Sequence, residues 1–224
     1  MSEKILILGG TREAAELALE LSEAGYAVIT SLAGRTKNPA GLTGDVRIGG
    51  FGGPEKMAQW MRENAVHRVI DATHPFAQQI SKNAKAACAM AEIPLDIRRR
   101  KPWLRQPQDL WHEVAGLAEA AAAIPKGARA FLALGSQHLS AFSTRSDVHF
   151  TVRMIDQPKG DIDLPDHALV LGAPSADWRE ESRLLQDNGI THIVCRNSGG
   201  SGAYAKIVAA RQLSIPVIII NMPT

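Results

Sequence analysis

The first thirty residues place strong limits on the fold of this chain. Residues 4–8 (Lys-Ile-Leu-Ile-Leu) form a short apolar run typical of a buried parallel strand. The run ends at Gly9-Gly10-Thr11, a helical pattern covers residues 12–24, and residues 26–30 again resemble a strand. Such a βαβ unit usually places a nucleotide phosphate at its first turn. Because a full G-x-G-x-x-G is absent, a plain turn between strand and helix remains the alternative.

The same alternation continues along the chain. We expect further strands near residues 45–48, 68–71 and 94–97, with helices at 54–64 and 76–91. After a proline-containing segment at 98–108, we expect strands near 111–114, 130–134, 148–151, 168–171, 192–195 and 216–220, and helices at 116–124, 136–142, 176–188 and 205–213. This pattern predicts an α/β protein with two Rossmann-like domains, residues 1–100 and 101–224, with mainly parallel sheets and a ligand cleft between the domains.

The end of the second expected strand bears on the choice of cofactor. NAD enzymes of this architecture usually carry Asp or Glu there, which accepts a hydrogen bond from the ribose 2′-hydroxyl. Residues 31–36 are Ser-Leu-Ala-Gly-Arg-Thr and contain no carboxylate. Arg35, together with nearby hydroxyl groups, suits a 2′-phosphate, which favours NADP(H) over NAD(H). The alternative is that Arg35 is an ordinary solvated loop residue.

A second glycine-rich loop lies near the C-terminus. Residues 197–202 (Asn-Ser-Gly-Gly-Ser-Gly) follow the apolar run 190–194 and precede the helix expected at 205–213. The glycines would let the backbone approach a ligand, and the helix would add its positive dipole end, so the loop suits an anion. The alternative is a flexible surface turn. Lys206 is expected either to reach that anion or to extend into solvent.

Composition excludes several classes of function. The net charge is +2, from 25 basic and 23 acidic residues, so nothing indicates nucleic-acid or membrane binding. Cys88 and Cys195 lie far apart and form no C-x-x-C, which argues against a disulfide framework or a metal site and for a reduced, cytoplasmic protein. Because a strand is expected from residue 4, we expect no signal peptide, and no apolar run reaches membrane-spanning length.

Taken in order, these segments resemble the precorrin-6A reductase family of cobalamin biosynthesis. The resemblance is carried by residues 5–14, 31–36, 49–53 (Gly-Gly-Phe-Gly-Gly), 71–77 (Asp-Ala-Thr-His-Pro-Phe-Ala), 80–84, 134–137 (Leu-Gly-Ser-Gln) and 196–206. Arg196 stands where many relatives carry Lys, which retains the charge. The resemblance implies hydride transfer from NADPH to one double bond of the precorrin-6A macrocycle, giving precorrin-6B. It also implies that the tetrapyrrole is the main partner, with channelling to neighbouring enzymes of the corrin pathway as an additional option.

With this resemblance, the N-terminal domain is expected to bind NADPH and the C-terminal domain to complete the cofactor and substrate site. Residues 49–53 would let the nicotinamide half approach closely, while Phe51 offers an apolar surface or packs into the core. Residues after the fourth strand should face the same site, and Thr73 is a candidate ligand of the cofactor amide. The candidate cofactor-binding residues are Gly9, Gly10, Thr11, Ser31, Gly34, Arg35, Thr36, Gly50, Phe51, Gly52 and Thr73.

The remaining candidates concern the macrocycle and the proton. His74 and Tyr204 are candidate proton donors, and solvent is equally plausible; His74 could instead be a structural histidine. Ser136 is expected to cap the next helix and leave its first N–H groups for a carboxylate arm. Residues 198–202 could bind the NADPH pyrophosphate instead of the substrate. The candidate substrate-binding residues are Ser136, Gln137, Asn197, Ser198, Gly199, Gly200 and Lys206.

Two alternative functions stay open. One is a cobalt-precorrin-6A reductase, which acts on a macrocycle that already holds cobalt. The other is a sensor that binds NADP(H) without catalysis. A short-chain dehydrogenase is disfavoured, because neither Tyr26 nor Tyr204 begins the Tyr-x-x-x-Lys pair that this class needs.

Overall fold

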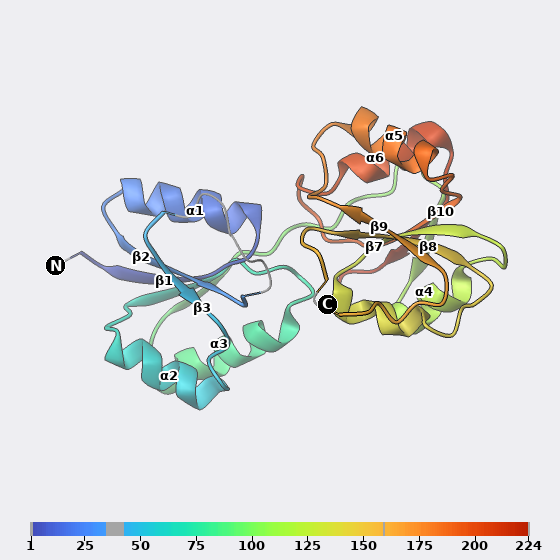
Figure 1. Ribbon diagram of the computed structural model, residues 1–224. Coiled ribbons are helices and arrows are strands. Elements are labelled where there is room, and N and C mark those ends of the chain that lie inside the picture. Colours follow the sequence, from blue (N-terminus) through green and yellow to red (C-terminus); the bar gives the residue numbers. More distant parts are fainter. Residues whose placement is uncertain (1, 35–42, 159, 224) are drawn as a thin grey trace. The chain divides into compact units, whose positions relative to one another are not determined.

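The computed structural model describes residues 2–34, 43–158 and 160–223 of the chain. The chain divides into two compact units, Met1–Arg100 and Lys101–Thr224. Each unit holds one parallel sheet with helices on both faces (Figure 1). The expected α/β class with parallel sheets is therefore confirmed. Arg35 and Thr36, two of the candidate cofactor-binding residues, lie outside the described residues.

The first unit contains a five-stranded sheet. Its elements are β1 (Lys4–Leu8), α1 (Arg12–Glu23), β2 (Ala27–Leu32), β3 (Asp45–Ile48), α2 (Pro54–Glu63), β4 (Arg68–Asp71), α3 (Gln78–Ala91) and β5 (Leu95–Ile97). The strand order is β3-β2-β1-β4-β5, and every pair is parallel. The order shows that the chain builds outward from β1 to β3 and then returns to build outward from β4.

The apolar run of β1 forms the centre of this unit because side chains alternate between the two faces of a strand. Ile5 and Ile7 pack with α1 on one face. Leu6 and Leu8 pack with α2 and α3 on the other. Figure 1 shows the same arrangement, with α1 on one side of the sheet and α2 and α3 on the opposite side. Burial on both faces explains why the strand is apolar throughout.

The second unit contains a six-stranded sheet. Its elements are β6 (Trp111–Val114), α4 (Leu117–Ala123), β7 (Arg129–Ala133), η1 (Ser136–Phe142), β8 (His149–Met154), β9 (His167–Leu171), α5 (Trp178–Asp187), β10 (His192–Arg196), α6 (Ala205–Leu213) and β11 (Val217–Ile220). The strand order is β6-β11-β10-β7-β8-β9, again with parallel pairs only. Phe131, Ile193 and Ile207 belong to its main core.

One expected helix differs in kind. Residues 136–142 form the 3₁₀ helix η1 rather than an α-helix, and Gly135 rather than Ser136 occupies its N-cap position. No side chain caps its first turn. The prediction that Ser136 caps this helix was therefore wrong: the chain turns one residue earlier, and Ser136 is already helical.

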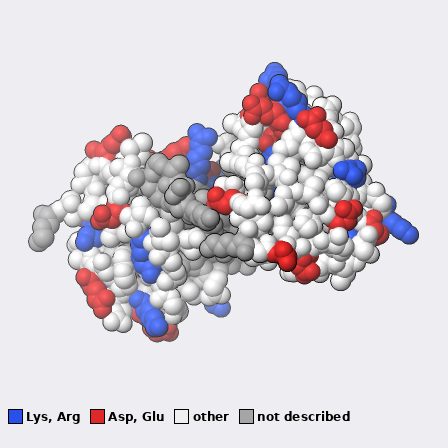
Figure 2. Space-filling view, viewed as in Figure 1, with Lys and Arg blue, Asp and Glu red and all other residues white. Residues whose placement is uncertain are grey.

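The surface is mixed in charge. Figure 2 shows acidic and basic side chains interspersed on the face drawn, as the near balance of the two types implies. Within the described ranges, no helix combines the length and the apolar character needed to cross a membrane.

Candidate functional site

In each sheet the order of the strands reverses at one place, the switch point. Ligands of open α/β sheets bind at the switch point, beyond the carboxyl ends of the strands. In the first unit this point lies between β1 and β4. The loop after β1 carries Gly9, Gly10 and Thr11, and the loop after β4 carries Thr73 and His74. The structure therefore brings these five predicted residues to the carboxyl ends of two neighbouring strands, β1 and β4.

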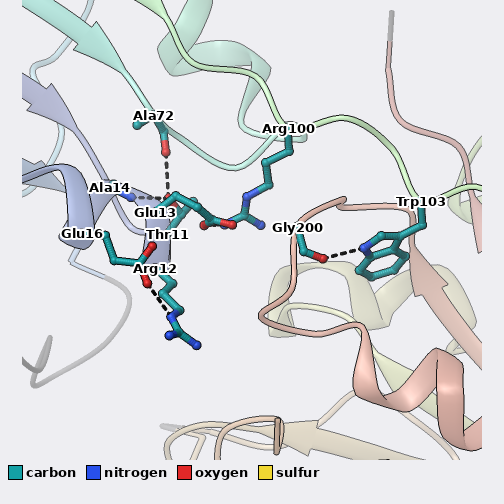
Figure 3. Close-up of polar contacts among 9 residues, drawn as sticks. All are labelled: Thr11, Arg12, Glu13, Ala14, Glu16, Ala72, Arg100, Trp103 and Gly200. Atoms are coloured by element: carbon teal, nitrogen blue, oxygen red, sulfur yellow. Dashed lines mark hydrogen bonds and ion pairs between the residues drawn. The ribbon is translucent and has the colours of Figure 1, made fainter.

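Thr11 joins the two loops. Its Oγ1 donates a hydrogen bond of 2.9 Å to the carbonyl oxygen of Ala72, after β4, and accepts one of 3.1 Å from the backbone N–H of Ala14 (Figure 3). The second bond makes Thr11 the N-cap of α1. Thr11 thus fixes the start of the helix against the loop after β4.

The two glycines before Thr11 are needed for different reasons. A Cβ at Gly9 would lie 2.9 Å from Cγ2 of Thr30, so close packing between loop and strand requires glycine there. Gly10 has a φ of +99°, and among the described residues no heavy atom beyond its chain neighbours lies within 4 Å of a Cβ built on it. Gly10 therefore presents open backbone, which a ligand can approach closely.

Thr73 and His74 are held by short-range hydrogen bonds. Both the backbone N–H and the hydroxyl of Thr73 donate to Oδ1 of the buried Asp71, at 3.1 and 2.6 Å. Nδ1 of His74 accepts from the backbone N–H of Phe76 at 3.3 Å. An accepting Nδ1 places the proton of the neutral imidazole on Nε2. His74 therefore has the form in which Nε2 is the proton-bearing nitrogen.

Charges near the start of α1 are paired. Arg100 forms an ion pair with Glu13 in the first turn of α1, and Arg12 pairs with Glu16 one turn later at 2.8 Å (Figure 3). The Arg12 pair is well exposed and contributes little to stability. The Arg100 side chain is only 17% exposed. The sequence does not reveal this pairing of Arg100, because its carboxylate partner is 87 residues away.

The glycine loop after β3 is organised by an arginine that sequence reasoning missed. The guanidinium carbon of Arg47 lies 3.7 Å from the ring centroid of Phe51. The same group donates hydrogen bonds to the carbonyl oxygens of Gly49 and Gly50. Phe51 also packs edge-on against Trp60 at 5.5 Å. Phe51 was expected either to offer an apolar surface to the cofactor or to pack into the core. The structure supports packing, because the ring contacts Trp60 and is covered by Arg47.

The end of β2 lies beside this loop. Ser31 is almost fully buried, and its backbone carbonyl accepts from the N–H of Gly9 at 3.0 Å. Gly34 has a φ of +76°, and a Cβ there would lie 2.9 Å from Cγ2 of Ile48. Ser31 and Gly34 therefore lie where β1, β2 and β3 end together.

In the second unit the strand order reverses between β7 and β10, which is the switch point of this sheet. His138, just after β7, and Arg196, at the end of β10, are joined by a contact of 2.7 Å between Nη2 and Nε2. Gln137 also approaches this imidazole, with Nε2 to Nε2 at 3.0 Å. A polar contact thus connects the two strand ends at the switch point of the second unit, as the hydrogen bond between Thr11 and Ala72 does in the first. Arg196 belongs to the segment 196–206 and His138 directly follows the segment 134–137, but neither was among the predicted site residues.

The loop at residues 197–202 is tied to Trp103. The Asn197 side chain accepts from the backbone N–H of Trp103 at 2.7 Å and donates to its carbonyl oxygen at 3.0 Å. The indole N–H of Trp103 donates to the carbonyl oxygen of Gly200 at 2.7 Å (Figure 3). Gly199 and Gly200 have φ values of +62° and +66°, a region that favours glycine. The loop is therefore a defined structure rather than a loose turn.

Lys206 and Tyr204 face the protein. Lys206 is 4% exposed, its Nζ donates to the carbonyl oxygen of Ala203 at 2.7 Å, and it lies 5.1 Å from the Trp103 ring. Burial lowers the pKa of this ammonium. The alternative of a solvent-exposed lysine was wrong. The Tyr204 hydroxyl accepts from Arg211 at 3.0 Å, seven residues further along the helix.

Comparisons with known proteins agree with this architecture. The sequence profile of the precorrin-6x reductase CbiJ/CobK family matches residues 4–224. A precorrin-6A reductase of Rhodobacter capsulatus is 44% identical over 98% of this chain and 88% of its own. A cobalt-precorrin-6A reductase of Priestia megaterium is 32% identical over 98% of this chain and 90% of its own. The solved structure of a CobK precorrin-6A reductase has a TM-score of 0.95 and 44% identity, covering 99% of this chain and 89% of that one. The resemblance found in the sequence is confirmed, and the chain belongs to the precorrin-6x reductase CbiJ/CobK family.

Proposed function

We propose that this protein reduces one double bond of precorrin-6A with NADPH in cobalamin biosynthesis. The observation that carries the proposal is the 44% identity, over nearly the whole chain, to a precorrin-6A reductase with the same fold. The relative named cobalt-precorrin-6A reductase is less similar, at 32% identity. This difference favours a metal-free macrocycle as the substrate.

The first unit is the proposed cofactor domain. The open backbone at Gly10, the N-terminus of α1 and the glycine loop at 49–53 fit a dinucleotide, whose phosphates bind at such turns. When bound, NADPH supplies the hydride. Ser31 at the end of β2, with no carboxylate in residues 31–36, supports NADPH over NADH. Arg35 and Thr36 remain candidates on sequence grounds.

The second unit is the proposed macrocycle domain. Its switch point gathers Gln137, His138, Arg196 and the loop at 197–202. A precorrin carries several carboxylate arms, and an arginine with backbone N–H groups suits them. We assign Asn197 and Lys206 to support of the loop, because their polar atoms bond to Trp103 and Ala203. Ser198, Gly199 and Gly200 remain the proposed ligand contacts.

His74 is the better of the two candidate proton donors. It follows β4 at the switch point, and its Nδ1 accepts a hydrogen bond from the backbone N–H of Phe76, which places the proton of the neutral ring on Nε2. The Tyr204 hydroxyl instead bonds to Arg211, about 10 Å along α6 from its start. We therefore propose that His74, or water next to it, delivers the proton that accompanies the hydride.

Substrate choice is tested by supplying the purified protein with precorrin-6A and with its cobalt complex, each with NADPH. The proposal expects faster reduction of the metal-free macrocycle, followed by its absorption spectrum. Faster reduction of the cobalt complex would move the protein to the other branch of the family. Binding of NADPH without reduction of either would favour a sensor. We further expect the enzyme to act in the cytoplasm, with channelling to neighbouring pathway enzymes as an open option.

A further inference from the structure

Arg47 lies on the strand beside the position at which dinucleotide-binding sheets recognise the adenosine ribose. It pairs in register with Ser31, which in turn pairs with Leu8, so the three residues form one row across β3, β2 and β1. Neighbouring residues in register point to the same face of a parallel sheet. In dinucleotide-binding sheets the residue that reads the ribose 2′ position stands at the end of β2, about twenty residues after the glycine turn. Arg47 stands on the strand next to that position.

The guanidinium of Arg47 keeps donors available. It has five N–H groups in one plane, and the recorded bonds to described residues are those to Gly49 and Gly50. Its flat face stacks on Phe51, and the N–H groups not bonded to Gly49 or Gly50 have no hydrogen-bond partner among the described residues. A Cβ added at Gly49 or Gly50 would meet no described residue within 4 Å, so the loop that follows Arg47 is open to a ligand on the side of the described residues.

The charge of Arg47 is also uncompensated. Four other arginines with largely covered side chains, Arg100, Arg145, Arg153 and Arg211, each pair with a carboxylate. Arg47 makes no ion pair with any carboxylate in the described part of the chain. Partial burial lowers its pKa, which means that the cation has lost hydration without gaining a counterion. A phosphate dianion would supply that counterion and accept two parallel N–H bonds.

We infer that Arg47 binds the 2′-phosphate of NADPH and thereby sets the preference for NADPH over NADH. This inference rests on the proposed function of the first unit as the cofactor domain. The alternative is that Arg47 only shapes the loop at 49–53. The two differ in one measurable respect: a phosphate ligand changes NADPH binding alone, whereas a loop support changes the binding of both cofactors.

Calorimetric titration of NADPH and NADH tests the inference on the wild type and on Arg47→Gln, Arg47→Lys and Arg68→Gln. Arg68 begins β4, at the amino end of the strand, where it pairs with Glu3 and Asp96, and serves as the matched control. We expect Arg47→Gln to weaken NADPH binding by about tenfold to a hundredfold with NADH unchanged, as for a lost hydrogen bond to a charged group. Arg47→Lys, which keeps the charge but not the fork, should lose less.

Competition with 2′,5′-ADP and 5′-AMP separates the phosphate from the rest of the nucleotide. Arg47→Gln should lose affinity for 2′,5′-ADP and keep it for 5′-AMP. Equal weakening of NADPH and NADH, or no weakening in a folded variant, would overturn the inference while leaving the proposed function in place. If Arg47→Gln fails to fold, an unchanged NADPH-to-NADH affinity ratio in Arg47→Lys would overturn it. Failure of the wild type to bind NADPH would instead overturn the proposed cofactor, and the inference with it.

Discussion

The indole N–H of Trp103 donates a hydrogen bond of 2.7 Å to the carbonyl oxygen of Gly200, 97 residues further along the chain. Together with the double contact between Asn197 and the Trp103 backbone, this bond fixes the loop at 197–202 to the start of the second unit. A loop rich in glycine loses much backbone entropy on ordering. Trp103 therefore orders, before any ligand arrives, a loop proposed to bind one.

Trp103→Phe removes the indole donor and keeps an aromatic ring in place. We expect a loss of about 0.5–1.5 kcal/mol in the free energy of unfolding, the usual net value of one hydrogen bond. Because the loop would be less ordered, KM for the macrocycle should rise while kcat changes little. Urea unfolding and steady-state kinetics measure the two effects. Trp178→Phe, at the start of α5 in the same unit, is the control; equal effects in both variants would contradict a specific role for Trp103.

Gly200→Val tests whether the loop backbone binds ligand. Gly200 has a φ of +66°, which valine adopts only with strain, whereas Gly202 lies outside that region and a Cβ built on it would meet no described residue within 4 Å. We expect Gly200→Val to abolish macrocycle binding while the unit stays folded, and Gly202→Val to be far milder. Circular dichroism checks the fold, and fluorescence titration checks binding. Intact activity in a folded Gly200→Val variant would reduce the loop to a surface turn.

His74→Asn removes the proposed proton donor and keeps a side chain of similar polarity. If the imidazole delivers the proton, kcat should fall by about a hundredfold or more, with cofactor affinity unchanged. Tyr204→Phe should have a much smaller effect, because its hydroxyl bonds to Arg211. Stopped-flow measurement of macrocycle reduction distinguishes the two. A His74→Asn variant with normal kcat would identify water as the donor.

Burial of His192 gives stability a pH dependence. The covered imidazole has a pKa below its ordinary value of 6.5, because burial disfavours the charged form. As pH falls below about 6.5, the unfolded chain binds a proton before the folded one does. The contribution of neutral His192 to the free energy of unfolding is therefore complete above that pH, and it is lost as the pH falls through the lower pKa of the folded state. Urea midpoints between pH 7.5 and pH 5 should therefore decline, and the decline should be smaller in His192→Gln; identical slopes would contradict this origin.

Much of the fold could be predicted from the sequence, because apolar runs such as residues 4–8 and the glycine turns after them mark parallel strands directly. The helix expected at 136–142 is present, but the capping role of Ser136 was wrong, since nothing in the sequence shows that Gly135 would occupy the N-cap position. Site residues at strand ends, such as Thr11 and His74, were also accessible to pattern reasoning.

Residues whose role depends on distant partners were not accessible in this way. Arg47 acquires its role through register with Ser31 and stacking on Phe51, and Lys206 is buried because Trp103 packs over it. A local pattern gives only the identity of such residues. Strand pairing, and packing between helices, strands and loops that are far apart in sequence, decide what such residues contact.

The most direct test of the account follows the absorbance of NADPH and of the macrocycle together, with precorrin-6A generated by the preceding enzymes of the pathway and NADH run in parallel. We expect NADPH to be oxidised in equal amount to the macrocycle reduced, and NADH to support the reaction poorly. Unchanged spectra with bound NADPH, or equal use of both cofactors, would contradict it.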